Sequence, residues 1–336
     1  MKKFDVISIG DTTLDVFLTL EDAKIRCDAN QEDCLLCVSY PDKVAVKSKT
    51  NVPAVGNAAN VAVGGARLGL ISALYTILGE DSTGKESFEK LKSEGVHKDY
   101  IKFDKKKGTN YSVVLNFQGD RTILVYHELR DYNLPALAKS DWVYLTSMGP
   151  NHQKLHQQVV DYVEKTGAKL GFNPGTHQLK EGLEALRPLI KKSTVLFVNK
   201  EEAQRLVGSD KIENPRHSRD EHGDIKKLLQ DLHNEGAKIV VITNGIKGSY
   251  SFDGDNFYFL DILKWPDIER TGCGDSYSTG FISALHLGCD VQEAMRWGTV
   301  NAASVLQKIG AQEGLLRRQE LLKILADNPQ LQTKKI

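Results

Sequence analysis

The chain has 336 residues, of which 40% are apolar and 26% are charged, enough for the buried core of one large or two modest domains. Its 44 lysines and arginines equal its 44 aspartates and glutamates, so the formal net charge is zero. That balance argues against a general nucleic-acid-binding protein. Five cysteines at this length do not indicate the disulfide framework of a small secreted domain.

The amino-terminal segment MKKFDVISIGD predicts a first strand rather than a signal peptide, because Asp5 interrupts an already short apolar run. No stretch reaches the roughly 18–20 apolar residues that are needed to cross a bilayer. We therefore expect a cytoplasmic globular protein that binds neither membrane nor nucleic acid.

Apolar runs of strand length alternate with helical patterns along most of the chain. Strands are predicted at Phe4–Ile9, Ser72–Leu78, Trp142–Thr146, Leu170–Asn173, Val195–Asn199, Lys238–Thr243 and Ser249–Phe252. Helices are predicted at Asn57–Leu70, Gly84–Glu94, His152–Lys165, Leu179–Lys191, Lys200–Val207, Ile225–Asn234 and Asp275–His286. This alternation indicates an α/β, doubly wound fold with a mostly parallel sheet flanked by helices.

Two regions interrupt the alternation. Val16–Val52 shows no clear helix, and Tyr111–Tyr126 predicts a hairpin that turns at Gln118–Asp120. We expect the segments at about 16–52 and 109–128 to form a β-sheet lid on a single domain, 1–336. Ser209–Asp224 predicts a surface loop, and the final residues, LQTKKI, a frayed tail.

The segment RTGCGDSYSTGF has the composition of an anion-binding helix start. Gly272 and Gly274 precede a long helical pattern, so backbone N–H groups could approach an anion that the helix dipole also attracts. Asp275 would then lie in the first turn, beside that anion. The same aspartate is equally compatible with an ordinary cap, which stabilises a helix by about 0.5–2 kcal/mol. The thiol of Cys273 is given no role.

Polar residues follow several predicted strands, at the edge where parallel sheets bind ligands. Asn199 and Glu202 could hold Mg²⁺ directly or through water, or could form a capping box. The glycines of Thr243–Gly248 could wrap phosphate oxygens, or simply form a turn. Asp11 and Asp15 could accept sugar hydroxyls, or make local turns.

Two motifs favour bland interpretations. Gly79–Glu86 nearly fits the phosphate-binding loop G-x-x-x-x-G-K-[ST], but Glu86 stands where a hydroxyl should hold Mg²⁺, so we interpret it as a strand-to-helix turn. Cys27, Cys34 and Cys37 are one ligand short of a structural zinc site. We interpret them as alternating buried and exposed positions of the lid.

Taken together, the motifs resemble the ribokinase/PfkB family of carbohydrate and nucleoside kinases, from Val6 to about Gly314. In family order they are VISIGDTTLD, VGNAANVAVGGARLG, GEDSTG, GDRTIL, NKEE, TNGIKG, RTGCGDSYSTGF and IGAQ. The resemblance implies a ribokinase-like fold with a lid. It also implies Mg²⁺-dependent transfer of the γ-phosphoryl group of ATP to a hydroxyl of a sugar or nucleoside.

By matching position, the resemblance implies a role for each motif residue. Asp275 would accept the proton of the substrate hydroxyl, and backbone N–H groups of Gly272, Cys273 and Gly274 would form the anion hole. Glu202 and Asn199 would position Mg²⁺ and phosphate through water. The nucleotide side would be lined by Thr243, Gly245 and Gly248, and the substrate would be held by Asp11, Asp15, Gly56, Asn57 and Asn60.

The sequence departs from the family pattern at three places. Val55-Gly56 replaces a glycine pair, Thr13 replaces a common asparagine, and Glu269 replaces an aspartate near which relatives bind a monovalent cation such as K⁺. The motif VGNAANVAVGGARLG is poor in aromatic residues, and the loop that carries Asp11 and Asp15 is rich in aspartate. Both features favour a sugar.

Two other functions stay open. A nucleoside kinase would add aromatic stacking from the lid, where the candidates are Tyr40, Phe117 and Tyr126. A non-catalytic sensor of sugar or nucleotide would bind without turnover. The family resemblance further implies a homodimer formed through lid strands.

Overall fold

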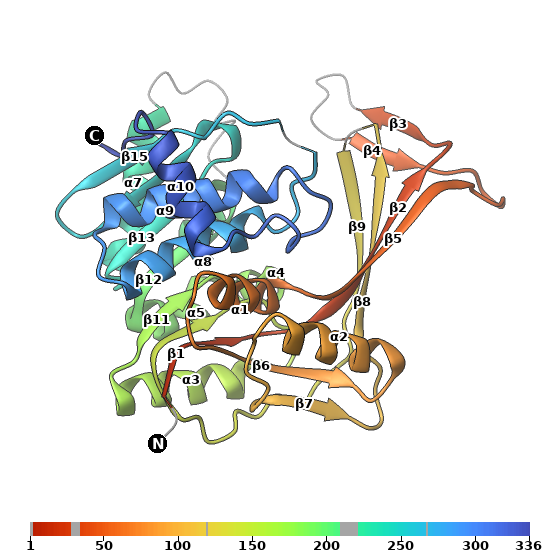
Figure 1. Ribbon diagram of the computed structural model, residues 1–336, viewed down its shortest axis with the longest axis horizontal. Helices are drawn as coiled ribbons and strands as arrows, with labels where there is room; N and C mark the ends of the chain where they lie inside the picture. The colour runs from red at the N-terminus through yellow and green to blue at the C-terminus, as the bar shows by residue number, and fades with distance from the viewer. Residues whose placement is uncertain (1–2, 28–33, 119, 209–220, 267) are drawn as a thin grey trace.

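A computed structural model describes residues 3–27, 34–118, 120–208, 221–266 and 268–336, which form a large sheet, a lid sheet and a short ribbon (Figure 1). The large sheet has ten strands in the order β16-β15-β14-β13-β12-β11-β10-β1-β6-β7. Their bounds are β1 (Lys3–Ile9), β6 (Ser72–Gly79), β7 (Ile101–Asp104), β10 (Lys139–Leu145), β11 (Lys169–Phe172), β12 (Ser193–Asn199), β13 (Ile239–Thr243), β14 (Ser249–Phe252), β15 (Phe257–Leu260) and β16 (Lys334–Lys335).

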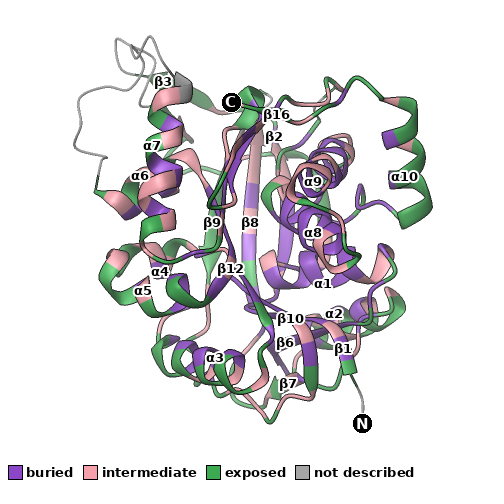
Figure 2. Ribbon diagram, turned by 90° about the vertical axis from the view of Figure 1, so that its left-hand side faces the viewer, coloured by how far each residue is buried: buried purple, intermediate pink, exposed green. Residues whose placement is uncertain are grey.

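Helices cover both faces of this sheet (Figure 2). They are α1 (Asn57–Arg67), α2 (Ser82–Ser93), α3 (Gln153–Thr166), α4 (Thr176–Lys180), α5 (Gly182–Lys192), α6 (Lys200–Val207), α7 (Glu221–Asn234), α8 (Cys273–His286), α9 (Val291–Val305) and α10 (Arg318–Asp327). Side chains of β1 pack into both layers: Phe4, Ile7 and Ile9 belong to one buried cluster, and Val6 belongs to the other. Apolar residues on both faces are typical of a doubly wound parallel sheet, so the predicted fold class is confirmed.

The order of the strands places a crevice at the carboxyl end of β1. In the order of the sheet, the strands β7, β6, β1, β10, β11, β12 and β13 are all parallel to one another. The strands β14, β15 and β16 then pair antiparallel. β1 lies between β6 and β10, so later strands of the chain are added on both sides of it. Ligands of open α/β sheets bind at such a switch point.

The lid sheet has the strand order β5-β2-β8-β9 and projects from the α/β body (Figure 1). Its strands are β2 (Thr13–Leu20), β5 (Val46–Val55), β8 (Asn110–Phe117) and β9 (Asp120–Tyr126). The β8–β9 hairpin confirms the hairpin that was predicted over Tyr111–Tyr126. Because β2 follows β1 directly and β5 leads into α1, the lid is anchored beside the crevice. Pairing of lids between two subunits stays a prediction.

Three local predictions need correction or restriction. The helix predicted over Leu179–Lys191 is two helices, because α4 ends at Lys180 and α5 begins at Gly182. The φ of Gly182 is 80°, which interrupts a right-handed helix. The carboxyl-terminal tail is not frayed, because β16 pairs with the otherwise open edge of β15 and Ile336 N donates to Phe257 O at 3.0 Å. Most of the predicted loop Ser209–Asp224 lies outside the described residues, and its last four residues begin α7.

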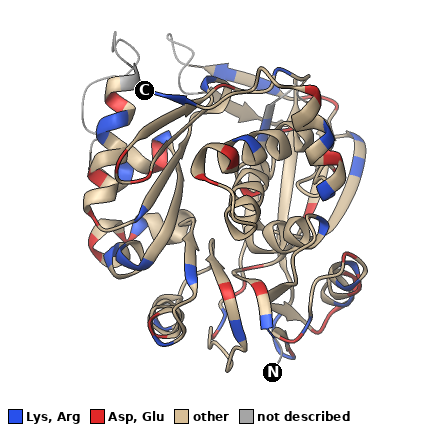
Figure 3. Ribbon diagram, turned by 60° about the vertical axis from the view of Figure 1, so that its left-hand side comes forward, with Lys and Arg blue, Asp and Glu red and all other residues tan. Residues whose placement is uncertain are grey.

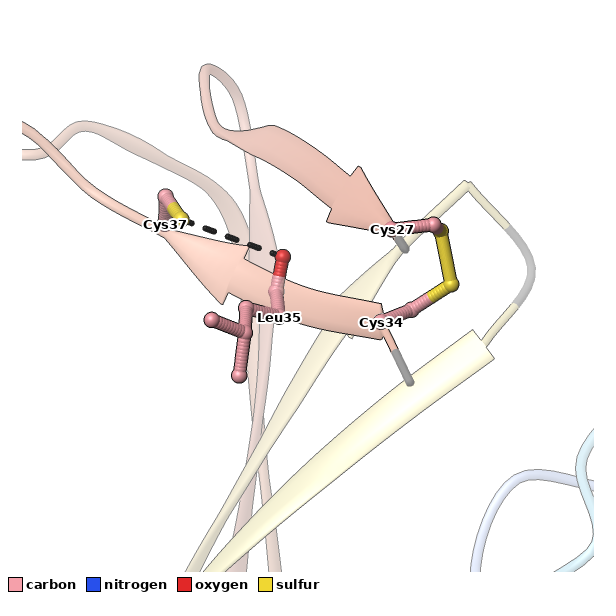
Figure 4. The surroundings of a disulfide bond; sticks show 4 residues. All are labelled: Cys27, Cys34, Leu35 and Cys37. Atoms are coloured by element: carbon pink, nitrogen blue, oxygen red, sulfur yellow. Dashed lines mark hydrogen bonds between the residues drawn. A yellow bond between two sulfur atoms is a disulfide. The ribbon is translucent and has the colours of Figure 1, made fainter. Parts of the chain in front are cut away.

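The cysteine prediction was wrong. Cys27 ends β3 (Lys24–Cys27), Cys34 begins β4 (Cys34–Cys37), and these directly opposed residues form a disulfide (Figure 4). Both lie on exposed positions rather than alternating with buried ones. Cys37 is free, and its thiol contacts Leu35 O at 3.9 Å. Cross-strand register, which cysteine spacing alone does not give, brought the pair together.

Basic and acidic residues are interspersed on the same helices (Figure 3). Among the described residues, no helix is both long and apolar enough to span a membrane.

Candidate active site

A cavity of about 720 Å³ lies between the lid and the carboxyl ends of the main strands. Its roof includes Arg121, Ile123 and Val125, which alternate along β9. Its floor includes the residues before and within the first turn of α8. The predicted site residues that line it are Asp11, Asp15, Gly56, Asn57, Asn60, Asn199, Glu202, Thr243, Gly272, Cys273, Gly274 and Asp275.

The start of α8 has the geometry of a backbone anion site. Gly272, the residue before the helix, has a φ of 79°, and a Cβ there would overlap Ala311, so both its dihedral angle and its packing require glycine. No side chain caps this helix end. Cys273 N makes only a long turn contact of 3.4 Å to Arg270 O, and a Cβ on Gly274 would meet open space. First-turn N–H groups at the cavity wall are therefore available to an anion.

Asp275 is buried in the first turn of α8 and faces the cavity. Its carboxylate Oδ2 accepts a hydrogen bond of 2.8 Å from Asn60 Nδ2 of α1. Burial raises the pKa of Asp275 to about 6; the Asn60 hydrogen bond opposes that shift and the charge of Glu202 adds to it. The carboxylate is thus ionised at neutral pH, and it is a stronger base than an exposed aspartate.

Asp15 and Gly56 form the lid side of the cavity. Burial raises the pKa of Asp15 to about 6, against the effect of a hydrogen bond from Ser112. Its Oδ1 is buried without a hydrogen-bond partner among the described residues. Gly56 has a φ of 106°, and a Cβ there would lie 2.7 Å from Asp11 O. Asp15 therefore has an unused acceptor at the cavity, which suits a ligand hydroxyl.

Asp11 is already engaged within the protein. Its Oδ2 accepts hydrogen bonds from Tyr132 Oη at 2.8 Å and from Gly149 N at 2.8 Å, and His127 Nδ1 lies 3.3 Å away. These partners fix the end of the cavity near the loop that follows β10. Asp11 therefore shapes the wall as well as lining it.

Asn199 and Glu202 form the capping box that the sequence left as an alternative. Asn199 Oδ1 accepts from Glu202 N at 2.8 Å, and Glu202 Oε2 accepts from Asn199 N at 2.9 Å. Burial raises the pKa of Glu202. Direct ligation of Mg²⁺ by Asn199 Oδ1 would break this cap, whereas the Glu202 carboxylate at the cavity fits a hydrated Mg²⁺ held through water.

The segment Thr243–Gly248 forms a turn between β13 and β14, with a 3₁₀ helix at Gly245–Lys247. Thr243 lines the cavity, but Gly245 and Gly248 do not. A Cβ on Gly248, whose φ is 84°, would overlap Leu260 O, so packing against β15 explains this glycine. The nucleotide role of the two glycines stays a prediction.

The near-match to a phosphate-binding loop is a strand-to-helix turn, as predicted. The carboxylate of Asp81 caps α2 by accepting from Gly84 N at 2.7 Å. A Cβ on Gly84 would overlap Gly79 O, and no residue of Gly79–Glu86 lines the cavity.

Several cavity residues were not named as site residues from the sequence. His127 and His177 line the cavity with their rings edge to face, 5.8 Å between centroids, and Arg121 faces it from the lid. The alternation of β9 could have indicated which of its side chains face inward, but not which of the two faces is the inner one. Gln312, in the motif IGAQ, donates to Asn60 Oδ1 at 3.1 Å, a contact between residues 252 positions apart.

Residues 17–318 match the family described as pfkB family carbohydrate kinase. Ribokinase from Haemophilus influenzae is 26% identical over 80% of this chain and 86% of its own length. A nucleoside kinase from Methanothermobacter thermautotrophicus is 24% identical over 93% of this chain and 92% of its own length. Arabidopsis thaliana ribokinase, solved with ribose and ATP, superposes with a TM-score of 0.77 at 22% identity, covering 96% of this chain and 99% of that one.

The chain therefore belongs to the pfkB family of carbohydrate kinases, and it is an ATP-dependent phosphotransferase with an alcohol group as acceptor. Its relatives include enzymes named for sugars and for nucleosides, so family membership alone does not choose the acceptor.

Proposed function

We propose that this kinase transfers the γ-phosphoryl group of ATP to a hydroxyl of a small sugar. The observation that carries the proposal is the position of Asp275: a buried carboxylate at the uncapped start of α8, facing the cavity beneath the lid. It lies beside the backbone N–H groups of the same turn, so a proton acceptor and an anion site adjoin one another.

The reaction divides among three parts of the site. Asp275 accepts the proton of the attacking hydroxyl, and the N–H groups of Gly272, Cys273 and Gly274 stabilise the charge that spreads over the phosphoryl oxygens. Asp15, Asn57 and Asn60, with Gly56 and Asp11, hold the sugar. The lid strands exclude water, so the phosphoryl group passes to the sugar and not to solvent.

Mg²⁺, when bound with ATP, neutralises phosphate charge, and Glu202 with Asn199 would hold it through water. Thr243, Gly245 and Gly248 would line the nucleotide side. A monovalent cation fits poorly beside Glu269, because Arg121 Nε already lies 3.5 Å from Glu269 Oε1. We therefore derive no step through K⁺.

The lid favours a sugar over a nucleoside. Of the three aromatic candidates, Tyr40 is 96% exposed and Tyr126 58% exposed, and neither they nor Phe117 line the cavity. Aliphatic Ile123 and Val125 occupy the roof, and they provide no ring on which a base could stack. A nucleoside kinase remains the second candidate, on the strength of the His127 and His177 rings at the cavity wall.

A substrate panel tests the proposal. Purified protein is incubated with Mg-ATP and a set of aldoses, ketoses, sugar acids, sugar phosphates and nucleosides, and products are read by ³¹P NMR and mass spectrometry. We expect a phosphorylated sugar, formed at least about a hundredfold more slowly by the Asp275→Asn variant. Products from nucleosides alone would assign the second candidate. Binding of sugar and ATP without any product would assign a sensor.

A further inference from the structure

A chain of two side-chain amides connects the backbone carbonyl of Ala54, just before the motif VGNAANVAVGGARLG, to the carboxylate of Asp275. Asn60 Nδ2 donates to Asp275 Oδ2 at 2.8 Å. On its other side, Asn60 Oδ1 accepts from Gln312 Nε2 at 3.1 Å, and the same Nε2 donates to Ala54 O at 2.7 Å. All three side chains are buried, with exposed fractions of 3% for Asn60, 1% for Gln312 and 6% for Asp275.

Ala54 O fixes the direction of this chain. A carbonyl oxygen only accepts hydrogen bonds, so the Gln312 amide must present its NH₂ end to Ala54 O. That NH₂ end in turn requires the oxygen of Asn60, which leaves the NH₂ end of Asn60 facing Asp275. If either amide rotated by half a turn, two acceptors or two donors would face each other in a buried site.

The orientation is maintained although it leaves one atom unsatisfied. Gln312 Oε1 is buried without a hydrogen-bond partner among the described residues. The segment that carries Gln312 is tied down separately, since Arg67 Nη1 donates to Gln312 O at 2.7 Å and to Leu315 O at 3.0 Å. A buried amide whose NH₂ group is fully bonded while its oxygen has no partner is typical of a side chain that positions a functional group.

We propose that Gln312 is a positioning residue, which locks the Asn60 amide so that its NH₂ group always faces the Asp275 carboxylate. The inference rests on the proposed role of Asp275 as proton acceptor. Gln312 does not line the cavity, so it acts on turnover through Asn60 and not by touching the substrate. Without it, the Asn60 amide is free to present its oxygen to the carboxylate, which would disfavour the ionised form.

The other groups near Asp275 do not obscure this effect. Tyr144 of β10 and Cys273 of α8 are kept neutral because burial raises the pKa of both, that of Cys273 to about 11. Glu202 of α6 is the remaining acidic neighbour, and its hydrogen bond from Asn199 N is independent of Gln312.

Gln312→Met tests the proposal, because methionine keeps the shape but removes both donors. We measure kcat and KM from pH 5.5 to 9 on the sugar that the panel identifies. We expect kcat to fall roughly tenfold near pH 6.5 and to recover partly by pH 9, with both KM values within about twofold of wild type. Ser87→Ala is the matched control, because Ala54 N donates a buried hydrogen bond to Ser87 Oγ at 3.1 Å. This variant removes a buried hydrogen bond from the same residue, Ala54, without touching the amide chain. It should leave the kcat profile unchanged.

A kcat profile of Gln312→Met that superimposes on the wild-type profile would overturn the proposal. An inactive wild type would instead contradict the proposed function, so a second readout avoids turnover. In ¹⁵N-labelled wild-type protein the side-chain NH₂ signals of Asn60 and Gln312 should shift together as Asp275 titrates, and Asp275→Asn should abolish both shifts. A static Gln312 signal beside a shifting Asn60 signal would reject the relay, even where Gln312→Met does not fold.

Discussion

Arg121 Nε lies 3.5 Å from Glu269 Oε1, an ion pair that joins the lid strand β9 to the loop leading into α8. The same oxygen accepts from Thr271 N at 2.9 Å and from Thr271 Oγ1 at 2.6 Å. The carboxylate is buried, with 6% of its side chain exposed, and the guanidinium is 27% exposed. The lid is therefore fastened, at its cavity-facing side, to the segment that carries the proposed anion site.

Breaking this contact should loosen the lid. We expect Arg121→Gln to raise the KM for the sugar roughly fivefold, the equivalent of the ~1 kcal/mol that such a pair contributes, and to increase ATP hydrolysis in the absence of sugar. Initial rates with and without sugar measure both effects. Lys49→Gln, on an exposed position of β5, is the control. Equal KM values for the two variants would show that the ion pair does not hold the lid.

The same contact predicts a weak response to monovalent cations. Because the guanidinium already faces Glu269 Oε1, replacing K⁺ by Na⁺ or by a bulky organic cation should change wild-type kcat by less than about twofold. Arg121→Gln should gain stimulation by K⁺, since Glu269 Oε2 is buried without a hydrogen-bond partner among the described residues and the variant removes the positive group that faces Glu269 Oε1. A strong K⁺ requirement in the wild type would contradict this view of the site.

Removing the charge of Asp275 should separate stability from turnover. We expect Asp275→Asn to lower kcat by ~10²–10⁴-fold, the range for loss of a general base, with ATP binding retained. The pKa of Asp275 is raised from 3.8 to about 6 on folding, so the native state binds the proton more tightly than the unfolded chain does. The free energy of unfolding therefore falls as the pH rises from about 4 to 6, by about 3 kcal/mol in total.

The asparagine variant does not bear that cost. Its free energy of unfolding should exceed that of wild type by up to about 3 kcal/mol at pH 7–8, and the difference should vanish below pH 4. Urea unfolding at several pH values measures the difference, and Asp261→Asn, on an exposed residue, is the control. Near wild-type turnover in Asp275→Asn would refute its role as base.

The pH profile of kcat should have an acidic limb. Asp275 works as a base only when ionised, so kcat should rise with pH to a plateau, with its midpoint near the pKa of about 6 that burial gives it. Burial raises the pKa of Asp15 to about 6 as well. Asp15→Asn distinguishes the two, because it should raise KM while leaving the limb of kcat in place. Disappearance of the limb in that variant would assign it to Asp15.

Lys85→Ala tests the rejected phosphate loop. Lys85 lies in the first turn of α2 and does not line the cavity. The variant should therefore retain kcat and the KM for ATP within about twofold. Loss of ATP binding, measured by calorimetry, would show that the loop interpretation was discarded wrongly.

The periodicity of the chain and its punctuation by glycine predicted most of the architecture. Apolar runs that are buried on both faces predict parallel strands, and the glycines at 272 and 274 predicted a helix start, because these signals depend on neighbours in the chain. The same local reasoning missed α9 and α10, and it judged the last residues to be frayed because nothing nearby in sequence shows that β15 has an open edge.

The chemistry of the site depended on contacts between distant segments. Sequence named Asn60, Asp275 and the motif containing Gln312, but only folding decides that these amides and this carboxylate meet in one buried line. Likewise, cross-strand register decides that Cys27 bonds to Cys34. Sequence by itself determined the family, most of the elements and most of the candidate residues, since local patterns encode them. Tertiary structure decided which polar atoms face each other, because hydrogen-bond direction and burial exist only once the segments are packed together.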